Sequence, residues 1–240
     1  MNTASQRVLV VIPAYNEAES LPGLIRELHV TYPAFDVLVV NDGSTDDTEA
    51  ALSKLPARVI SLPCNLGVGG AVQTAFMLAF EEEYDIAIQV DGDGQHPPGE
   101  IPKLLAAMED CGADMVLGSR FLRADGYRST RGRRLANRLF SCILSALTGW
   151  PITDATSGVR AWNRRAIRVL AKEYPEDYPE VEAILRLHQA GLRICEVSVN
   201  MLARTTGSSS IGSLEAITYM VKVPVALLMS LLRRRAPQSF

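Results

Sequence analysis

The stretch VLVVIP, Val8–Pro13, is a continuous apolar run dominated by β-branched residues. Such a run is typical of a parallel strand that is buried on both faces. Similar runs recur at Asp36–Val40 and Asp85–Val90, with helical segments between them. This alternation predicts an α/β fold, in which a mostly parallel sheet is flanked by helices and its strands are joined by right-handed crossovers.

The other elements can be placed by working outward from this run. The predicted strands before residue 120 are Val8–Pro13, Asp36–Val40, Val59–Leu62, Asp85–Val90 and Ala113–Gly118. Helices are expected from Asn16 to about His29, after Thr45 or Asp46, over Gly69–Glu83 and from about Ile101. Beyond Arg120 we expect an arginine-rich loop over 121–134, a helix over Arg133–Leu147, a polar turn over Thr153–Arg160, a helix over Tyr178–Gly191 and a strand over Leu192–Met201.

The composition excludes several classes of protein. Of 240 residues, 48% are hydrophobic and 21% charged, which is too apolar for a disordered chain. A net charge of −3 gives no basic field and predicts no nucleic-acid partner. The four cysteines form no CxxC pair, which favours free thiols in a reducing compartment over a zinc site. The apolar run before Pro13 is too short for a signal peptide, so we expect no secretion signal.

Polar residues follow four of the predicted strands. These stretches are Pro13–Glu17 (PAYNE), Asn41–Ser44 (NDGS), Asn65–Gly70 (NLGVGG) and Asp91–Gln95 (DGDGQ). In an open parallel sheet, ligands bind beyond the carboxyl ends of the strands. Because four predicted strands each end in a polar stretch, the sequence predicts a ligand site along this edge of the sheet.

Asp91, Asp93 and Gln95 are spaced by two residues. If the chain stays extended beyond its strand, their side chains share one face. Two carboxylates and an amide form a partial shell for Mg²⁺ or Mn²⁺, which is completed by water and substrate phosphate. The alternative is a solvated Asp-Gly turn.

The glycine-rich stretch at Asn65–Gly70 fits neither common phosphate motif. Val72 stands where a dinucleotide fingerprint needs Gly or Ala, and no GKS or GKT follows. The stretch still places backbone N–H groups at a helix N-terminus, which suits a diphosphate. A plain turn before a helix is the alternative.

Several motifs together resemble a known family. PAYNE, NDGSTDDT, NLGVGGAVQTAF, DGDGQHPP, GSRF and SGVRAWNR, in this order, resemble family 2 glycosyltransferases of the dolichol- or polyprenol-phosphate sugar synthase type, over about Arg7–Arg204. The resemblance implies a GT-A fold with a Rossmann-like sheet. We divide the chain into a catalytic domain (1–210), with a nucleotide-sugar and metal half (7–120) and an acceptor half (121–210), and an amphipathic helical tail (211–240).

The resemblance also implies roles for individual residues. Donor binding falls to Pro13, Tyr15, Glu17 and Asp42, joined by Gly70 and Asp91. Asp91, Asp93 and Gln95 would hold the Mg²⁺ or Mn²⁺ ion. Acceptor binding falls to Arg120, Arg133, Arg134, Ser157 and Arg204, and the expected catalytic residues are Asp93, Arg120 and Asp154. The chain departs from the family at Asn41, where Asp is frequent, which bears on the choice of nucleotide base.

The acceptor decides what other chemistry is needed. A lipid monophosphate is largely dianionic near neutrality and attacks without a base, but it needs cations such as Arg120 to orient it. A sugar hydroxyl needs a general base, for which Asp154 or Glu180 is the best candidate. Solvated surface arginines, a helix cap or a salt bridge are the structural alternatives. Arg204 and Ser208 lie in a segment (RTTGSSS) that could be a lid or a plain linker.

The C-terminal tail is apolar and ends in Arg233–Arg235. Its longest uncharged piece, Val223–Leu232, is far shorter than the ~20 residues of a spanning helix. We therefore expect a helix that lies in the membrane interface or docks on a small membrane subunit, and hence a cytoplasmic, peripheral protein. Packing on the enzyme's own body or a homo-oligomer face is the alternative.

The sequence thus predicts an inverting, metal-dependent transfer of a sugar from a nucleotide-sugar to polyprenyl phosphate at the cytoplasmic membrane face. The runner-up uses a hydroxyl of a glycan or lipid-linked sugar as acceptor. A non-catalytic nucleotide-sugar binder has no need of the Asp91–Gln95 set. A nucleotidyltransferase usually carries a Gly/Arg/Lys-rich loop after its first strand, where this chain has PAYNE.

Overall fold

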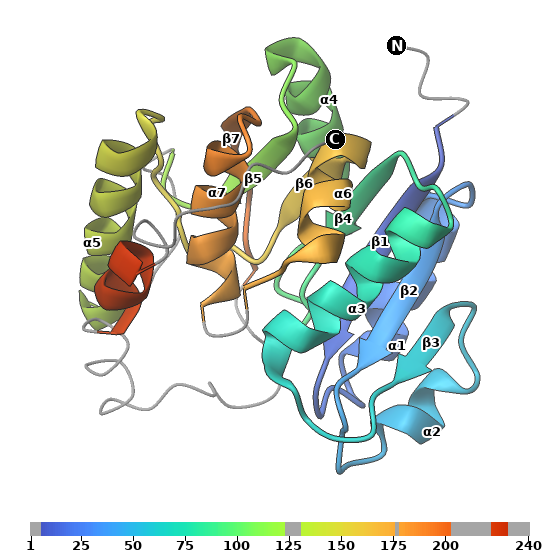
Figure 1. Ribbon diagram of the computed structural model, residues 1–240. Helices are drawn as coiled ribbons and strands as arrows, with labels where there is room; N and C mark the ends of the chain where they lie inside the picture. Colours follow the sequence, from blue (N-terminus) through green and yellow to red (C-terminus); the bar gives the residue numbers. More distant parts are fainter. Residues whose placement is uncertain (1–5, 123–130, 176–177, 203–221, 230–240) are drawn as a thin grey trace.

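The computed structural model describes residues 6–122, 131–175, 178–202 and 222–229. Within these residues the strands form one seven-stranded sheet of order β3-β2-β1-β4-β6-β5-β7. The strands are β1 (Val8–Ala14), β2 (Asp36–Asn41), β3 (Arg58–Ser61), β4 (Ile86–Gln89), β5 (Met115–Ser119), β6 (Arg160–Asn163) and β7 (Ile194–Ser198). The mostly parallel α/β sheet expected from the sequence is therefore confirmed (Figure 1).

Helices cover both faces of the sheet (Figure 1). They are α1 (Leu21–Thr31), α2 (Thr48–Leu52), α3 (Gly67–Glu81), α4 (Ile101–Cys111), α5 (Arg131–Thr148), α6 (Arg164–Lys172) and α7 (Pro179–Gln189), with a short 3₁₀ turn η2 (Pro98–Glu100) before α4. The strands and helices placed from the sequence up to residue 201 all occur, with ends shifted by a few residues.

The polar stretch up to Arg160 leads into a strand that the sequence analysis did not predict. β6 pairs antiparallel with β4 on one side and with β5 on the other, whereas the other pairs are parallel. The strand has only four residues, RAWN, and begins with a charged one. Such a short stretch shows no alternation of apolar and polar residues from which a strand could be predicted. Because β6 is antiparallel, it begins at the edge where its neighbours end. The sequence preceding Arg160 is thus brought between the ends of β4 and β5.

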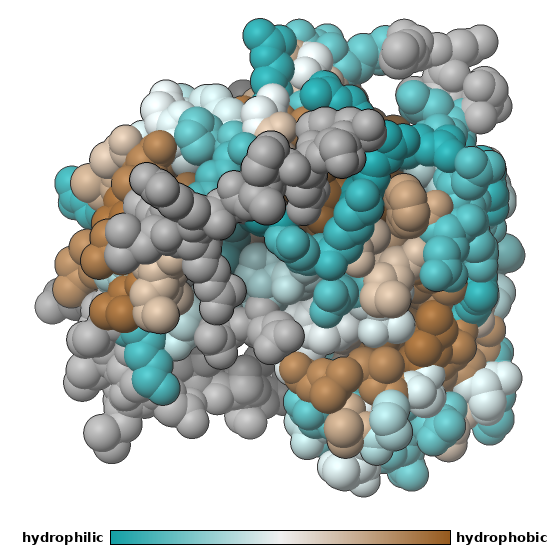
Figure 2. Space-filling view, in the orientation of Figure 1, coloured by the Kyte–Doolittle hydropathy of each residue, from teal (hydrophilic) through white to brown (hydrophobic). Residues whose placement is uncertain are grey.

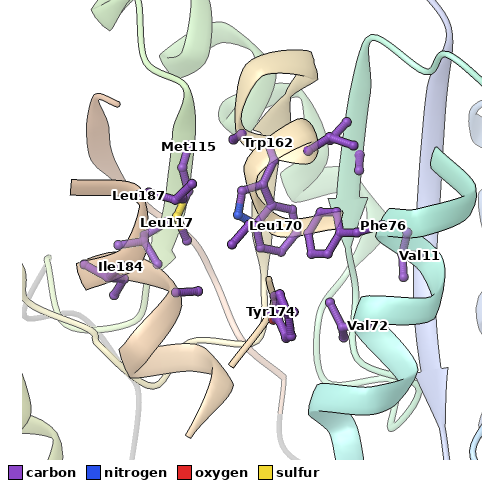
Figure 3. Close-up of a cluster of buried hydrophobic side chains, with 14 of the residues drawn as sticks. Val11, Val72, Phe76, Met115, Leu117, Trp162, Leu170, Tyr174, Ile184 and Leu187 are labelled. Atoms are coloured by element: carbon purple, nitrogen blue, oxygen red, sulfur yellow. The ribbon is translucent and has the colours of Figure 1, made fainter. Parts of the chain in front are cut away.

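Two apolar cores lie on the two faces of the sheet. One is formed by the inward faces of α3, α5, α6 and α7, and the other by α1 and α4. In the first core Phe76 of α3 meets Trp162 of β6 edge-on, with ring centroids 4.9 Å apart, and Tyr174 lies 5.4 Å from Phe76 (Figure 3). Aromatic contacts of this kind add to the apolar burial that fixes the helices on the sheet.

Residues 222–229 are helical, and they are the only part of the predicted tail that the structure describes. Val223 and Leu227 are buried in the first core, so this face of the helix packs on the protein itself. Val225, Leu228 and Met229 are exposed. Among the described residues, no helix has both the length and the hydropathy needed to cross a bilayer.

Candidate active site

The candidate site lies along the edge where the parallel strands end. The loop after β1 is held to the loop after β2, because Asp42 N–H donates to the carbonyl of Ala14 at 2.8 Å. Asn16 has a left-handed backbone with φ of 57°. This conformation lets its N–H donate to Ser44 Oγ while its side-chain oxygen accepts from Thr45 N–H at 2.8 Å. The predicted donor residues around them thus lie on two loops that hydrogen bonds hold together.

Three of these donor residues differ in exposure. The Tyr15 ring is 46% exposed, and Glu17 is partly buried and accepts a hydrogen bond from Ser20 Oγ at 2.7 Å. Pro13 is the partly buried residue near the end of β1. Tyr15 is the one with a large open face.

Asp42 is almost fully buried, and its Oδ1 accepts from Leu66 N–H at 2.7 Å. This bond draws the loop before α3 toward the end of β2. Gly43 has φ of 65° and lies so close to Asn65 that a Cβ there would be 2.7 Å from its nitrogen. Only glycine suits that position. Gly70 lies one turn into α3, with Leu66 packed over it. The loop after β2 and the start of α3 therefore form one unit.

The Asp91–Gln95 segment is a turn, so the extended course that would place the three side chains on one face does not occur. Its central residues have turn conformation, and Gly94 has φ of 70°. The physical cause is local: Asp93 Oδ1 accepts the N–H of Gln95 at 3.0 Å, a bond that bends the chain back. Gln95 is also held by Leu202, which accepts its side-chain Nε2–H and donates its own N–H to the Gln95 carbonyl.

Asp91 lies between three groups. Gln89 Nε2 lies 3.4 Å from its Oδ1, and His96 Nδ1 lies 3.5 Å from its Oδ2. On the third side is Gly158, where a Cβ would come within 3.0 Å of the carboxylate. The His96 ring is 3% exposed, and neither of its nitrogens has a hydrogen-bond partner among the described residues. A buried polar group in this state is costly, so the surroundings of Asp91 are the part of this edge that calls for a functional explanation.

The donor chemistry of Asp91, Asp93 and Gln95 suits a Mg²⁺- or Mn²⁺-like ion, but not a closed structural site. Within the described ranges, no three His, Cys, Asp or Glu side chains form a group that could hold an ion. Asp91 and Asp93 supply two carboxylates, and the Gln95 amide directs its nitrogen to Leu202, which leaves its oxygen as an acceptor. Ions such as Mg²⁺ take one or two carboxylates and complete their shell with water and substrate phosphate.

Arg120 follows β5 directly and forms a two-armed ion pair with Asp154. Nε lies 2.6 Å from Oδ2 and Nη2 lies 2.7 Å from Oδ1, and the backbone N–H of Arg120 donates to Oδ2 at 3.0 Å. The Asp154 carboxylate is fully buried, and the Arg120 side chain is 13% exposed. This geometry fixes the plane of the guanidinium at the edge of the sheet.

Ser157 and Glu196 brace the residues around this pair. The Ser157 hydroxyl is buried and donates to the Gly118 carbonyl at 2.6 Å. Glu196 of β7 accepts the N–H groups of Thr153 and Asp154 at 2.9 and 3.1 Å. Burial raises the pKa of the Glu196 carboxyl, although these hydrogen bonds act in the opposite direction. The Ser157 hydroxyl hydrogen is not directed at a ligand but at the Gly118 carbonyl. Direct contact between Ser157 and the acceptor stays a prediction.

Glu180, in the first turn of α7, is the other candidate base. Burial raises the pKa of its carboxyl, and the nearby Arg160 guanidinium partly offsets this effect. Arg160 is 1% exposed and donates to the backbone carbonyl of Glu180 at 2.7 Å.

The remaining predicted acceptor residues are less well placed by the structure. Arg134 is exposed on α5. The side chain of Arg133 and the whole of Arg204 and Ser208 lie outside the described residues. The sequence analysis assigned no individual role to His96, Gly158 or Glu196, and it placed Arg160 only within a motif near the expected acceptor site. A weak signal existed for two of them: His96 directly follows Gln95, and Glu196 interrupts an otherwise neutral strand.

Comparison with known proteins gives consistent results. The sequence profile described as Glycosyl transferase family 2 matches residues 9–170. An undecaprenyl-phosphate mannosyltransferase from Micrococcus luteus is 34% identical over 218 residues, covering 86% of this chain and 88% of that protein. A polyprenol monophosphomannose synthase from Mycolicibacterium smegmatis is 31% identical over 229 residues, covering 91% and 86%.

The fold also matches solved structures. The crystal structure of glucosyl-3-phosphoglycerate synthase from Mycobacterium tuberculosis, in complex with Mn²⁺, UDP and glucosyl-3-phosphoglycerate, superposes with a TM-score of 0.74. The match covers 98% of this chain and 83% of that one at 23% identity, so it shows a shared fold.

Proposed function

The chain belongs to glycosyl transferase family 2, and we propose that it transfers a sugar from a nucleotide-sugar to the phosphate of a polyprenyl lipid. The two most similar relatives described above are named for transfer to undecaprenyl phosphate and for synthesis of polyprenol monophosphomannose. The structural observation that carries the proposal is the Arg120–Asp154 pair, which presents an oriented guanidinium at the edge that also bears Asp91.

The donor half supplies the binding groups for a nucleotide diphosphate. The open face of Tyr15 suits stacking against a base, and the unit built by Asp42 and Gly43 brings the start of α3 to the same edge. Backbone N–H groups at a helix N-terminus favour diphosphate oxygens. Pro13, Glu17 and Gly70 complete this half in the proposal.

A divalent cation is part of the proposed chemistry. Asp91, Asp93 and Gln95 would hold Mg²⁺ or Mn²⁺, which when bound acts as a Lewis acid on the leaving diphosphate. The chain's own contribution is to fix the carboxylates: Gln89 and His96 flank Asp91, and the turn holds Asp93 against the Gln95 N–H.

The acceptor half favours a phosphate over a hydroxyl. Both Asp154 oxygens accept hydrogen bonds from Arg120 and the carboxylate is fully buried, so it is badly placed to take a proton from a substrate. A phosphate monoester needs no such base, because it is largely dianionic above its second pKa of about 6. Arg120 would orient it through its guanidinium, and Arg133, Arg134 and Arg204 would offset its charge as further cations.

One observation favours the runner-up, transfer to a sugar hydroxyl. Burial raises the pKa of Glu180, and a carboxylate with a raised pKa is a better general base at neutral pH. In that reaction Glu180 would take the hydroxyl proton.

We further propose that an apolar patch contacts the cytoplasmic membrane surface. It consists of Leu135 and Leu139 on α5 and of Val225, Leu228 and Met229 on the helix 222–229, all exposed. Figure 2 shows brown, hydrophobic surface over α5, on the left of the view. Exposed apolar surface of this kind marks an interaction site, and a lipid acceptor has to be taken from a membrane. A small membrane protein docked on this patch, or a second copy of the chain, is the alternative.

The test is an acceptor comparison with the purified full chain. Nucleotide-sugars carrying uracil, guanine or thymine are supplied with Mn²⁺ and either polyprenyl phosphate or a polyprenyl-diphosphate-linked sugar. We expect a polyprenyl-phosphate sugar as product, identified by mass, with inverted anomeric configuration. A product formed only with the lipid-linked sugar would establish the runner-up. Donor binding without turnover on either acceptor would contradict both.

A further inference from the structure

The topology of the sheet brings one short segment between the two halves of the site. β6 begins at Arg160, which pairs with Gln89 of β4 on one side and with Leu117 of β5 on the other. Because β6 is antiparallel to both, the segment that leads into it and includes its first residue, Asp154–Arg160, lies at the edge where β4 and β5 end. We call this segment the connecting turn. Asp91 follows β4 and Arg120 follows β5, so the connecting turn lies between them.

On the donor side, the connecting turn presses against Asp91. The ideal Cβ position at Gly158 lies within 3.0 Å of both carboxylate oxygens and of the carbon that joins them. Real Cβ atoms are not found at such distances. The φ angle of Gly158 is not in the left-handed region, so its backbone conformation does not call for glycine. The closeness of the Asp91 carboxylate is the physical reason for glycine here.

On the acceptor side, the connecting turn holds Arg120. Asp154, its first residue, forms the two-armed ion pair with the guanidinium. Thr156 Oγ1 accepts a further hydrogen bond from Nη2 at 3.0 Å. Ser157 ties the turn to β5 through the Gly118 carbonyl, two residues before Arg120.

Arg160 holds the turn together from inside. Its Nε donates to the Ser157 carbonyl at 2.7 Å, and its Nη2 donates to the Ala155 carbonyl at 3.0 Å. Its Nη1 donates to the Glu180 carbonyl at 2.7 Å, which joins the turn to α7. The planar guanidinium directs three N–H donors at three separate backbone carbonyls. A lysine ammonium is a single centre and cannot reach all three.

We propose that the connecting turn is a single support for both halves of the site, and that Gly158 and Arg160 are positioning residues of the transfer reaction. Gly158 sets the position of the Asp91 carboxylate. Arg160 sets the shape of the turn, and through it the separation of Asp91 from Arg120. This inference rests on the proposed function, since it takes Asp91 as a metal ligand and Arg120 as the holder of the acceptor phosphate.

The reaction explains why one support serves both sides. The bond from the anomeric carbon to the donor diphosphate breaks as the bond to an acceptor phosphate oxygen forms, and the electron pair leaves on the nucleoside diphosphate. The reacting atoms have to lie about 3 Å apart, and a misplacement of about 1 Å costs on the order of 100-fold in rate. A turn that contacts both the ligand carboxylate and the acceptor arginine fixes the separation of the two groups that hold the reacting molecules.

The first test is Gly158→Ala in the full chain, with Gly23→Ala as its matched control. Both add one methyl group, but at Gly23, on α1, no atom lies within 4 Å of it. The probe is Mn²⁺ alone, followed by the EPR signal of the free ion. The added methyl group has to displace the Asp91 carboxylate. Changes to the groups around a metal ligand typically weaken metal binding about 10- to 100-fold, and we expect this for Gly158→Ala. Gly23→Ala should bind Mn²⁺ as the wild type does. Unchanged Mn²⁺ affinity in folded Gly158→Ala protein would overturn the proposal.

The second test is Arg160→Lys, with the exposed Arg165→Lys as control. We expect Arg160→Lys to lower kcat about 100-fold and to raise both the Mn²⁺ dissociation constant and the KM for polyprenyl phosphate. A variant that is only less stable has fewer active molecules, which lowers kcat alone. An effect on kcat alone would therefore overturn the role of Arg160. If Arg160→Lys does not fold, Gly158→Ala still decides the contact with Asp91.

The two readouts separate this inference from the proposed function. If the wild type transfers no sugar to lipid phosphate, the proposed function fails, while the Mn²⁺ comparison still reports on the support of Asp91. If transfer occurs but Gly158→Ala binds Mn²⁺ normally, only the inference fails.

Discussion

Arg120 and Asp154 are joined through two separate nitrogen–oxygen contacts, of 2.6 and 2.7 Å, and the carboxylate has no solvent exposure. The pair connects the end of β5 to the turn before β6, which are 34 residues apart in the sequence. Asp154 therefore orients the arginine, and Arg120 balances the charge of the buried Asp154 carboxylate. The predictions below follow from this arrangement and from its neighbours.

Asp154→Asn should destabilise the protein and weaken acceptor binding. Removing one charge of a buried pair typically costs about 3 kcal/mol, because the other charge is left uncompensated. Urea unfolding should report a fall of about this size, and steady-state kinetics a higher KM for polyprenyl phosphate. Asp110→Asn, at an exposed position on α4, is the control and should stay within about 0.5 kcal/mol of the wild type. Wild-type stability in Asp154→Asn would show that the pair is not energetically important.

Asp93→Asn should abolish the stimulation of transfer by Mn²⁺. The variant keeps the size of the side chain and its hydrogen bond to Gln95 N–H, but it loses the charge that holds the ion. We expect a loss of about 100-fold or more in kcat, as is typical when a charge-stabilising group is removed from a reacting centre. Initial rates against free Mn²⁺, after dialysis with a chelator, measure this. Full wild-type activity in the presence of the chelator would show that no metal is needed.

Glu196 should make stability fall as the pH rises. Burial raises the pKa of Glu196 above its ordinary 4.5, so the folded protein binds this proton more tightly than the unfolded chain does. The contribution of Glu196 to the free energy of unfolding therefore decreases from pH 4.5 upward, until the pKa of the folded state has been passed. Glu196→Gln has no carboxyl group at this position and therefore lacks this pH-dependent contribution. Urea unfolding across this range should show the variant gaining stability relative to the wild type as the pH increases, whereas a constant difference would contradict the assignment.

Leu135→Glu and Leu228→Glu should weaken binding to lipid vesicles. Burying one leucine contributes about 1.5–3 kcal/mol, so each charge introduced there should lower the partition coefficient at least about tenfold. Val30→Glu is the control, because Val30 is 80% exposed on α1 and lies outside the patch. Co-sedimentation with anionic vesicles gives the comparison. Equal losses in all three variants would point to a general charge effect and not to this patch.

Much of the fold could be predicted because its first two strands, β1 and β2, are apolar and almost wholly buried. Val8–Ala14 and Asp36–Asn41 give continuous signals, and the polar residues after them could be placed at one edge by topology alone. β6 could not be predicted in this way. Its four residues carry no period, and nothing local shows that it runs antiparallel between two parallel neighbours.

Only the features of the site that depend on neighbouring residues in the sequence could be predicted. The Asp91–Gln95 spacing indicated the ligands, but the bend comes from a side-chain bond of Asp93 that spacing does not show. The contact of Gly158 with Asp91 joins residues far apart in the chain, so it depends on the position of β6. Arg160 stood out only as part of the SGVRAWNR motif, because its positioning role depends on the carbonyl groups that surround it in the fold.

The most direct test of the central claim is the rate of sugar transfer to polyprenyl phosphate by Arg120→Ala, measured beside its affinity for Mn²⁺. The account predicts that transfer falls about 100-fold or more, through loss of the group that orients the acceptor phosphate. Mn²⁺ affinity should stay within a factor of two or three, about the scatter of single contacts. Transfer at the wild-type rate would contradict the assignment of Arg120 to the acceptor, and with it the phosphate mechanism.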